Sequence, residues 1–273
     1  GTRYWNVCRY RNGQVEVVTK IAGECAKPLW RLGTSGYGFI SRSEMLLSYS
    51  VEGEGRLARV DLATGNLRDL ELPYSDISHL QVGNGFAAFV GGRPDAPSAL
   101  VRLDLKSFET RELRVSSDDF SKEIRGLVSR PEKITVPTGD GCKEATHAFF
   151  YPPCNPGFQA DPKDQPPLLI FVHGGPTAAT ATSLNLEIQY FTSRGFAVVD
   201  MNYRGSTGFG RAYRQKMYGA WGVVDTQDCV AAAQYLIDQG RADRYRIASR
   251  GGSSGGYTTL ALATFTDLLT AAA

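Results

Sequence analysis

The sequence has 273 residues, of which 42% are hydrophobic and 21% charged, close to the averages for globular proteins. The formal net charge is only +2, with 30 basic and 28 acidic residues interspersed, which argues against a nucleic-acid-binding or membrane-binding surface. The longest apolar runs, such as 167–172, are too short to span a bilayer.

The cysteines and the two ends of the chain bear on its environment and completeness. Five cysteines are scattered without a CxxC or Cys/His cluster, so we expect free thiols, no metal site, no cofactor and a reducing, cytoplasmic location. The chain starts at Gly1 and stops within the apolar stretch 270–273. We therefore expect a piece of a longer protein, for which the absence of a targeting signal says little.

The first half of the sequence contains a β-rich repeat. The stretch 59–70 recurs at 102–113, an offset of 43 residues, and each copy reads as strand, tight turn and strand. A further strand precedes each copy, at 44–50 and 86–90, and a poorer third copy lies before residue 40. A period in the low forties with about four strands per unit is typical of β-propeller blades. Residues 1–130 are therefore predicted to form a partial propeller of two to three blades, with a generic β-sandwich as the alternative.

The pattern changes after residue 130. A hairpin is expected over 133–136 and 145–151, followed by a Pro-rich surface loop over 152–167. Strands at 168–172, 196–201 and 246–249 then alternate with helices at 184–194, 225–239 and 257–265. The first of these helices is expected to begin at a cap formed by Thr182 or Ser183. Strand-helix alternation with continuous apolar strands predicts a parallel sheet covered by helices on both faces over residues 131–273.

A glycine-rich turn between the last strand and the last helix carries the chemistry. Strand, Gly-x-Ser-x-Gly and helix is the nucleophile elbow of α/β-hydrolases, in which a serine stands at a strained apex and glycines avoid collisions on both sides. Two registers fit the spacing, one with Ser253 between Gly251 and Gly255 and one with Ser254 between Gly252 and Gly256. The spacing alone leaves both open.

A second glycine turn ends the first buried strand, in the sequence His173-Gly-Gly-Pro176. Backbone amides at such an edge can stabilise the oxyanion that develops in acyl transfer. Pro176 has no N–H, so Gly174 or Gly175 is the expected donor.

Several other residues could be mistaken for catalytic groups. In α/β-hydrolases the triad runs Ser, then Asp or Glu, then His, whereas all three histidines precede the serine. We therefore expect a structural role for His173 and ordinary packing or exposure for His79 and His147. Asp225 and Asp228 read as first-turn acids favoured by a helix dipole rather than a catalytic pair. The glycine loop 204–210 matches neither a dinucleotide fingerprint nor a Walker A motif, so phosphate binding is not expected.

Four motifs together resemble the prolyl oligopeptidase family of serine peptidases, in its acylaminoacyl peptidase and dipeptidyl peptidase branch. They recur in order at 173–176, 202–211, 221–228 and 251–257. The resemblance is strong over 131–273, and the predicted blades fit the propeller that precedes the catalytic domain in that family.

The resemblance implies a register and a set of roles. In the family pattern the second glycine pair is followed by an aromatic residue, which makes Ser253 the nucleophile and Gly251 and Gly255 the elbow glycines. It also implies that the amides of Ser254 and Gly175 form the oxyanion hole. The resemblance implies that the substrates are short peptides admitted past a propeller gate. We also expect that the protein can form homo-oligomers.

One departure from the family pattern is large. The family's acid and base lie downstream of the elbow, and this chain ends 20 residues after Ser253. We therefore expect an α/β-hydrolase domain truncated after the elbow, lacking the triad Asp and His and inactive by itself. The alternatives are a carboxylesterase with the same elbow and a catalytically inactive propeller protein used for binding.

Overall fold

The computed structural model describes residues 3–28, 30–118, 120–161 and 163–273. The chain divides into two compact units. Unit 1 comprises 1–120 with two short segments from later in the chain, 181–184 and 207–212, and unit 2 comprises the remainder of 121–273. The predicted domain limits, 1–130 and 131–273, remain predictions.

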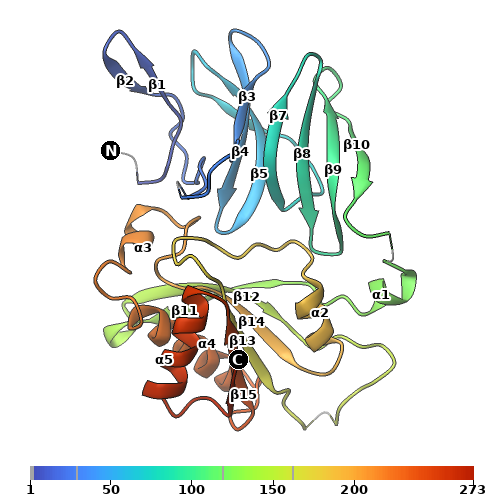
Figure 1. The fold of residues 1–273 in the computed structure, drawn as a ribbon, viewed down its shortest axis with the longest axis vertical. Coiled ribbons are helices and arrows are strands. Elements are labelled where there is room, and N and C mark those ends of the chain that lie inside the picture. The colour runs from blue at the N-terminus through green and yellow to red at the C-terminus, as the bar shows by residue number, and fades with distance from the viewer. Residues whose placement is uncertain (1–2, 29, 119, 162) are drawn as a thin grey trace. The chain divides into compact units, whose positions relative to one another are not determined.

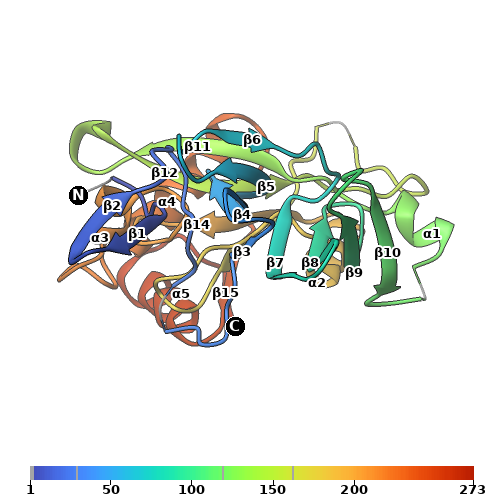
Figure 2. The ribbon, with the colours of Figure 1, turned by 90° about the horizontal axis from the view of Figure 1, so that it is seen from above.

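Unit 1 contains two four-stranded antiparallel sheets whose strands follow one another in chain order. Figure 2 shows the strands of the second sheet side by side in that order. Buried residues of both sheets, among them Leu57 and Phe89, form one hydrophobic core. The first sheet consists of β3 (Tyr37–Phe39), β4 (Glu44–Val51), β5 (Glu54–Asp61) and β6 (Leu67–Asp69), and the second of β7 (Asp76–Val82), β8 (Phe86–Arg93), β9 (Ala96–Asp104) and β10 (Thr110–Val115).

The sequence repeat corresponds to equivalent turns in the two sheets. Asp61 ends β5 and Asp104 ends β9, and in each case one carboxylate oxygen accepts the amides two and three residues further on. Gly65 and Phe108 both have positive φ, 73° and 58°, so the fourth residue after each of these aspartates has the same left-handed backbone. Each repeat therefore contributes one four-stranded meander, as expected for a propeller blade. The poorer copy before residue 40 forms only a two-stranded sheet of β1 (Cys8–Arg11) and β2 (Gln14–Val17) among the described residues.

Unit 2 is built on a six-stranded sheet with the order β11-β12-β14-β13-β15-β16. The strands β13, β14 and β15 are parallel, as predicted, but the sheet is mixed because β12 pairs antiparallel to β14. The predicted hairpin thus extends the sheet instead of standing apart from it. The strands are β11 (Glu132–Thr138), β12 (Glu144–Tyr151), β13 (Leu168–Val172), β14 (Ala197–Asn202), β15 (Ile247–Gly251) and β16 (Ala271–Ala272).

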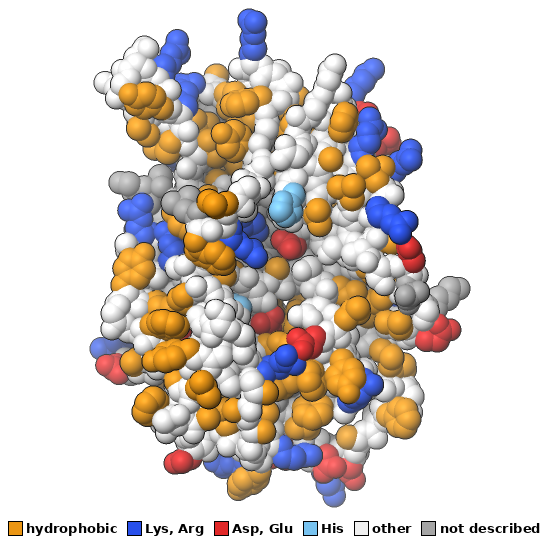
Figure 3. All heavy atoms as spheres, viewed as in Figure 1, with side chains coloured by type: hydrophobic (Ala, Val, Ile, Leu, Met, Phe, Trp, Pro, Cys, Tyr) orange, Lys and Arg blue, Asp and Glu red, His pale blue; other side chains and the backbone are white. Residues whose placement is uncertain are grey.

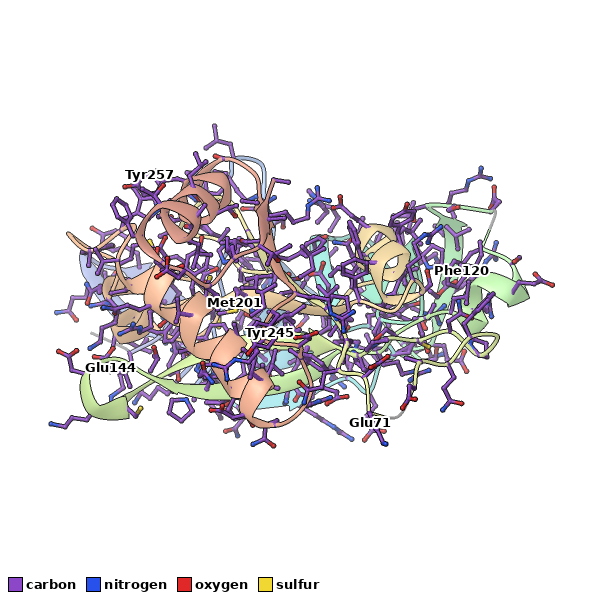
Figure 4. The ribbon with its side chains drawn as sticks, turned by 90° about the horizontal axis from the view of Figure 1, so that it is seen from below. Glu71, Phe120, Glu144, Met201, Tyr245 and Tyr257 are labelled. Atoms are coloured by element: carbon purple, nitrogen blue, oxygen red, sulfur yellow. The ribbon has the colours of Figure 1, made fainter. Side chains whose placement is uncertain are left out.

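Helices cover both faces of this sheet (Figure 1). Buried residues of α4 and α5 share a core with one face, including Met201, and Ile188 of α2 packs against Phe171 and its neighbours on the other. Figure 4 shows Met201 in the interior and Tyr257 at the outside of α5. The helices are α1 (Lys122–Gly126), α2 (Leu186–Thr192), α3 (Arg211–Gln215), α4 (Val224–Asp238) and α5 (Ser254–Phe265), with a 3-10 turn at Asp140–Cys142.

Two helix starts differ from the prediction. The cap of α2 is Asn185, whose side chain accepts the amides of Glu187 and Ile188, rather than Thr182 or Ser183. The preceding segment 181–184 packs in unit 1, where the Thr182 hydroxyl donates to the Ser75 hydroxyl at 2.7 Å and is not available to the helix. Helix α5 starts at Ser254, directly after the elbow, instead of at residue 257.

Candidate active site

The elbow serine stands between β15 and α5. Ser253 has φ 53° and ψ −121°, a conformation that side-chain-bearing residues rarely adopt, and its side chain is exposed. By contrast, Ser254 is the first residue of α5 and is buried. A strained, exposed serine between a strand and a helix is the geometry of a nucleophile elbow.

Close backbone packing explains why glycine flanks this serine. A Cβ atom at Gly255 would lie 2.0 Å from the carbonyl oxygen of Val172, and one at Gly251 would lie 2.4 Å from the backbone of Gly255. A Cβ at Gly252 would meet nothing within 4 Å. The sterically required pair is therefore Gly251 and Gly255, which supports the register centred on Ser253.

The second glycine turn lies beside the elbow. Strands β13 and β15 are parallel neighbours, with Val172 opposite Gly251, so the turns that follow them start at the same edge of the sheet. A Cβ atom at Gly174 would lie 3.4 Å from the Cβ of Ser253. This carboxyl edge of the strands is where open α/β sheets bind ligands.

Two backbone amides are available at this edge. Within the described ranges, the amides of Gly175 and Ser254 donate to no protein acceptor. The Ser254 amide belongs to the first turn of α5, where N–H groups have no intrahelical partner and the helix dipole favours negative charge. Both amides are thus free to donate to an oxyanion.

His173 is bound to groups other than Ser253. Its Nδ1 is 2.8 Å from the carbonyl oxygen of Gly174. Because a carbonyl oxygen can only accept, Nδ1 carries the proton and donates it. Its Nε2 is 2.8 Å from the Ser206 hydroxyl. Its ring stacks on Tyr203 with centroids 4.4 Å apart. Burial lowers the pKa of His173 to about 4, so the ring is neutral at neutral pH and Nε2 accepts the Ser206 proton. These contacts fit the structural role expected from the sequence.

The other two histidines lie in strands. His79 is exposed on β7. His147, on β12, lies 3.2 Å from the Thr135 hydroxyl and packs on the Tyr213 ring. Both environments agree with the packing and exposure expected for these residues.

Asp225 and Asp228 are fully buried hydrogen-bond acceptors, a role that the helix-dipole interpretation did not capture. Asp228 accepts from the backbone amide of Arg204 at 2.6 Å and from its Nε at 2.8 Å. Asp225 accepts from the Gly222 amide and from the Thr258 hydroxyl of α5. Each aspartate ties α4 to another segment of unit 2, and the two do not form a catalytic pair.

The glycine loop after β14 begins with this buried arginine. Arg204 also pairs with Glu144, which in turn pairs with Lys216, and Figure 4 places Glu144 at the end of the β11–β12 hairpin. The guanidinium is thus paired with two carboxylates. These pairs could not be predicted from local sequence patterns, because the partners of Arg204 lie 24 and 60 residues away.

The structure adds two further observations. Figure 3 shows charged side chains of both signs interspersed over the visible face, in line with the small net charge. Among the residues with described positions, no three His, Cys, Asp or Glu side chains gather as metal ligands would, and no helix is long and apolar enough to cross a membrane.

Comparison with known sequences identifies a family and several similar proteins. Residues 182–273 match the prolyl oligopeptidase family, which confirms the resemblance drawn from the motifs. Dipeptidyl aminopeptidase BIII of Pseudoxanthomonas mexicana is 40% identical over 100 residues, 37% of this chain and 14% of that protein. The acylamino-acid-releasing enzyme of Arabidopsis thaliana is 39% identical over 93 residues, 34% of this chain and 12% of that protein.

Solved structures match over nearly the whole chain. A puromycin-hydrolyzing peptidase of Mycobacterium tuberculosis has a TM-score of 0.92 at 40% identity, over 98% of this chain and 41% of that one. The acylaminoacyl peptidase of Pyrococcus horikoshii has a similar fold, with a TM-score of 0.73 at 22% identity, over 96% of this chain and 39% of that one. The chain therefore spans about two fifths of the length of these solved relatives.

Proposed function

We propose that this chain, which belongs to the prolyl oligopeptidase family of serine peptidases, is part of an enzyme that hydrolyses short peptides through an acyl-enzyme on Ser253. The observation that carries the proposal is the elbow itself. Ser253 is exposed at φ 53°. A Cβ atom on the glycine two residues before it would lie 2.4 Å from backbone atoms, and one on the glycine two residues after it 2.0 Å, so both positions require glycine.

The proposed reaction follows serine acyl transfer. The Ser253 hydroxyl oxygen attacks the scissile carbonyl and its proton passes to a base; the amine then leaves with a proton, and water releases the acyl group. The amides of Ser254 and Gly175 would donate to the oxyanion. Each such donor is worth about 10²–10³ in kcat in other serine hydrolases.

The acid and base are proposed to come from residues of the parent protein that follow the elbow. The three histidines of this sequence all precede Ser253, contrary to the triad order of this fold. We therefore propose that the 273 residues alone are inactive, since loss of triad members lowers kcat by about 10⁴ or more. We also propose that the parent protein is cytoplasmic and can form homo-oligomers. Further blades of the parent would complete a propeller ring, which would limit the substrates to short peptides.

Puromycin is a specific candidate substrate. The relative at 40% identity over nearly the whole chain is described as puromycin-hydrolyzing. Puromycin contains an amide bond beside a free α-amino group, the type of bond that an aminopeptidase cleaves. We propose that the parent enzyme accepts such aminoacyl amides.

The test uses the full-length parent protein with puromycin, aminoacyl and peptidyl p-nitroanilides, and p-nitrophenyl esters. We expect turnover of the amide substrates that is lost in Ser253→Ala. Turnover of the esters alone would instead identify a carboxylesterase. No turnover of any substrate, together with no reaction with a fluorophosphonate, would identify a catalytically inactive binding protein.

A further inference from the structure

A short stretch of chain, Asp200–Ser206, makes repeated side-chain contacts with the loop that carries Gly175. This stretch comprises the end of β14 and the residues after it, and the loop, here called the oxyanion loop, is 173–180. At the start of the loop, the Tyr203 hydroxyl donates to the carbonyl of His173 at 2.9 Å, and the Ser206 hydroxyl contacts His173 Nε2. The start of the loop is thus fixed to the chain that follows β14.

The end of the loop is held at Thr180 by two side chains from one face of β14. The Thr180 hydroxyl donates to the carboxylate of Asp200. The Thr180 amide donates to Asn202 Oδ1 at 2.9 Å, and the Asn202 amide group donates back to the Thr180 carbonyl at 3.4 Å. Asp200 and Asn202 are two residues apart on a strand, so their side chains leave the same face of the sheet. Every hydrogen-bonding group of Thr180 is therefore engaged.

Asp200 has an unusual environment for a carboxylate. It is 6% exposed and lies between Phe149 and Phe171 of the flanking strands. Burial raises its pKa to about 7, and the Thr180 hydroxyl opposes that shift. Arg250, which lies opposite Phe171 on β15, two strands from Asp200, pairs with Glu187 and lies over the Phe171 ring. Burying a carboxyl group costs free energy unless the group is hydrogen-bonded, so the hydrogen bond from Thr180 offsets part of the cost of burying Asp200.

Thr180 is the residue at which the oxyanion loop leaves unit 2, so its hydrogen bonds fix the end of the loop. The next four residues, 181–184, pack in unit 1, so Thr180 is the last residue of the loop that belongs to unit 2. Inside the loop, Gly175 packs closely on Ala178, where an added Cβ would lie 3.0 Å from the Ala178 side chain. A shift of Thr180 would therefore be transmitted to Gly175 through a short, compact turn.

We propose that Asp200 and Asn202 are positioning residues that act through Thr180 to fix the oxyanion loop and hence the direction of the Gly175 amide. This inference rests on the proposed function, because it assigns the Gly175 amide to the oxyanion. An amide displaced by about 1 Å can cost on the order of 10²-fold in rate. The contribution is made in the transition state, so it falls on kcat rather than KM.

The experiment compares Thr180→Val with Thr180→Ser in the full-length parent protein, assayed with a peptidyl p-nitroanilide. Valine keeps the shape of threonine and removes the hydroxyl donor, whereas serine keeps it. We expect Thr180→Val to lower kcat by about tenfold or more with KM changed less than about twofold, and Thr180→Ser to stay within about twofold of the native enzyme. Affinity for a peptide aldehyde, which forms a tetrahedral adduct, should fall by the same factor as kcat/KM.

A further variant covers the case in which Thr180→Val does not fold because it leaves the Asp200 carboxyl without a partner. The double variant Thr180→Val with Asp200→Leu removes both members of the bond, a change that can be nearly neutral for stability. We expect it to show the same loss of kcat. Native kcat and aldehyde affinity in the folded Thr180→Val or double variant would overturn the inference.

Fluorophosphonate labelling separates this inference from the proposed function. If the native protein is not labelled, the assignment of Ser253 fails, whatever the Thr180 variants do. If it is labelled and the Thr180 variants retain native kinetics, only the positioning role fails.

Discussion

Gly255 approaches the carbonyl oxygen of Val172 so closely that a Cβ atom on it would lie 2.0 Å from that oxygen. This contact joins the first turn of α5 to the end of β13, the strand that leads into the oxyanion loop. The elbow and the loop are thus held together by backbone packing that only glycine permits.

The first prediction follows from that contact. In the full-length parent protein, Gly255→Ala should lower the free energy of unfolding by about 1–3 kcal/mol or more, the cost typical of overpacking, and abolish fluorophosphonate labelling, because the turn must open to admit the methyl group. Gly252→Ala is the matched control, since its Cβ meets nothing within 4 Å. Denaturant unfolding and labelling of the two variants provide the measurement. Equal behaviour of the two alanines would contradict the steric account of the elbow.

The second prediction concerns the buried pair of Arg204 and Asp228. Asp228→Ala should lower the free energy of unfolding by about 3–5 kcal/mol, because it leaves a buried guanidinium without that partner. The side chain of Asp228 is 0% exposed and that of Arg204 5%. Urea unfolding followed by tryptophan fluorescence would measure the change.

An exposed pair supplies the control for this prediction. Arg114 and Asp118 are 3.3 Å apart with side chains 76% and 67% exposed. Asp118→Ala should change the free energy of unfolding by less than about 1 kcal/mol. If Asp228→Ala lowers the free energy of unfolding no more than Asp118→Ala does, burial does not strengthen the interaction of Asp228 with Arg204.

The third prediction is that His173 stays neutral well below neutral pH. Burial lowers the pKa of this histidine from its usual 6.5 to about 4. Histidine NMR of the protein, with the His173 signals assigned by their absence in His173→Gln, should show the neutral ring at pH 5.5. A midpoint near 6.5 would contradict the buried, hydrogen-bonded ring described above.

The lowered pKa of His173 also makes the stability of the protein depend on pH. Between pH 6.5 and 4 the unfolded chain binds a proton at His173 that the native state does not, so this residue's contribution to stability is present above 6.5 and is lost as pH falls towards 4. Asp200, whose pKa is raised to about 7, has the opposite effect on stability: its contribution is lost as the pH rises from 3.8 to 7. Comparing native protein with His173→Gln cancels the Asp200 effect. The difference in unfolding free energy between the two should increase with pH from 4 to 6.5, and a flat difference would contradict the shift.

The sequence predicted those features that depend on local pattern. The turn repeat at Asp61 and Asp104, the parallel strands β13 to β15 and the two glycine turns follow from short spacings and apolar periodicity. The mixed pairing of β12 with β14 did not follow, because strand partners are chosen by tertiary packing. The late start of α2 could not be foreseen either, since Thr182 is a good cap by type and is lost to a hydroxyl 107 residues away.

The candidate site, too, was predictable from the sequence only in part. The Gly-x-Ser-x-Gly spacing located the elbow, but it left Ser253 and Ser254 as alternatives. Steric contacts at Gly251 and Gly255, and their absence at Gly252, favour one register on physical grounds. The contacts of Asp200 with Thr180 had no signature in the sequence, because a lone aspartate in an apolar strand has no distinctive spacing.

The most direct test of the central claim is to map the serine that reacts. The full-length parent protein is treated with a fluorophosphonate, digested and analysed by mass spectrometry. We predict one adduct on the peptide containing the elbow, with fragment ions that place it on Ser253. The adduct should be lost in Ser253→Ala and retained in Ser254→Ala. An adduct on Ser254, or full labelling of Ser253→Ala, would contradict the assignment of Ser253 as the nucleophile.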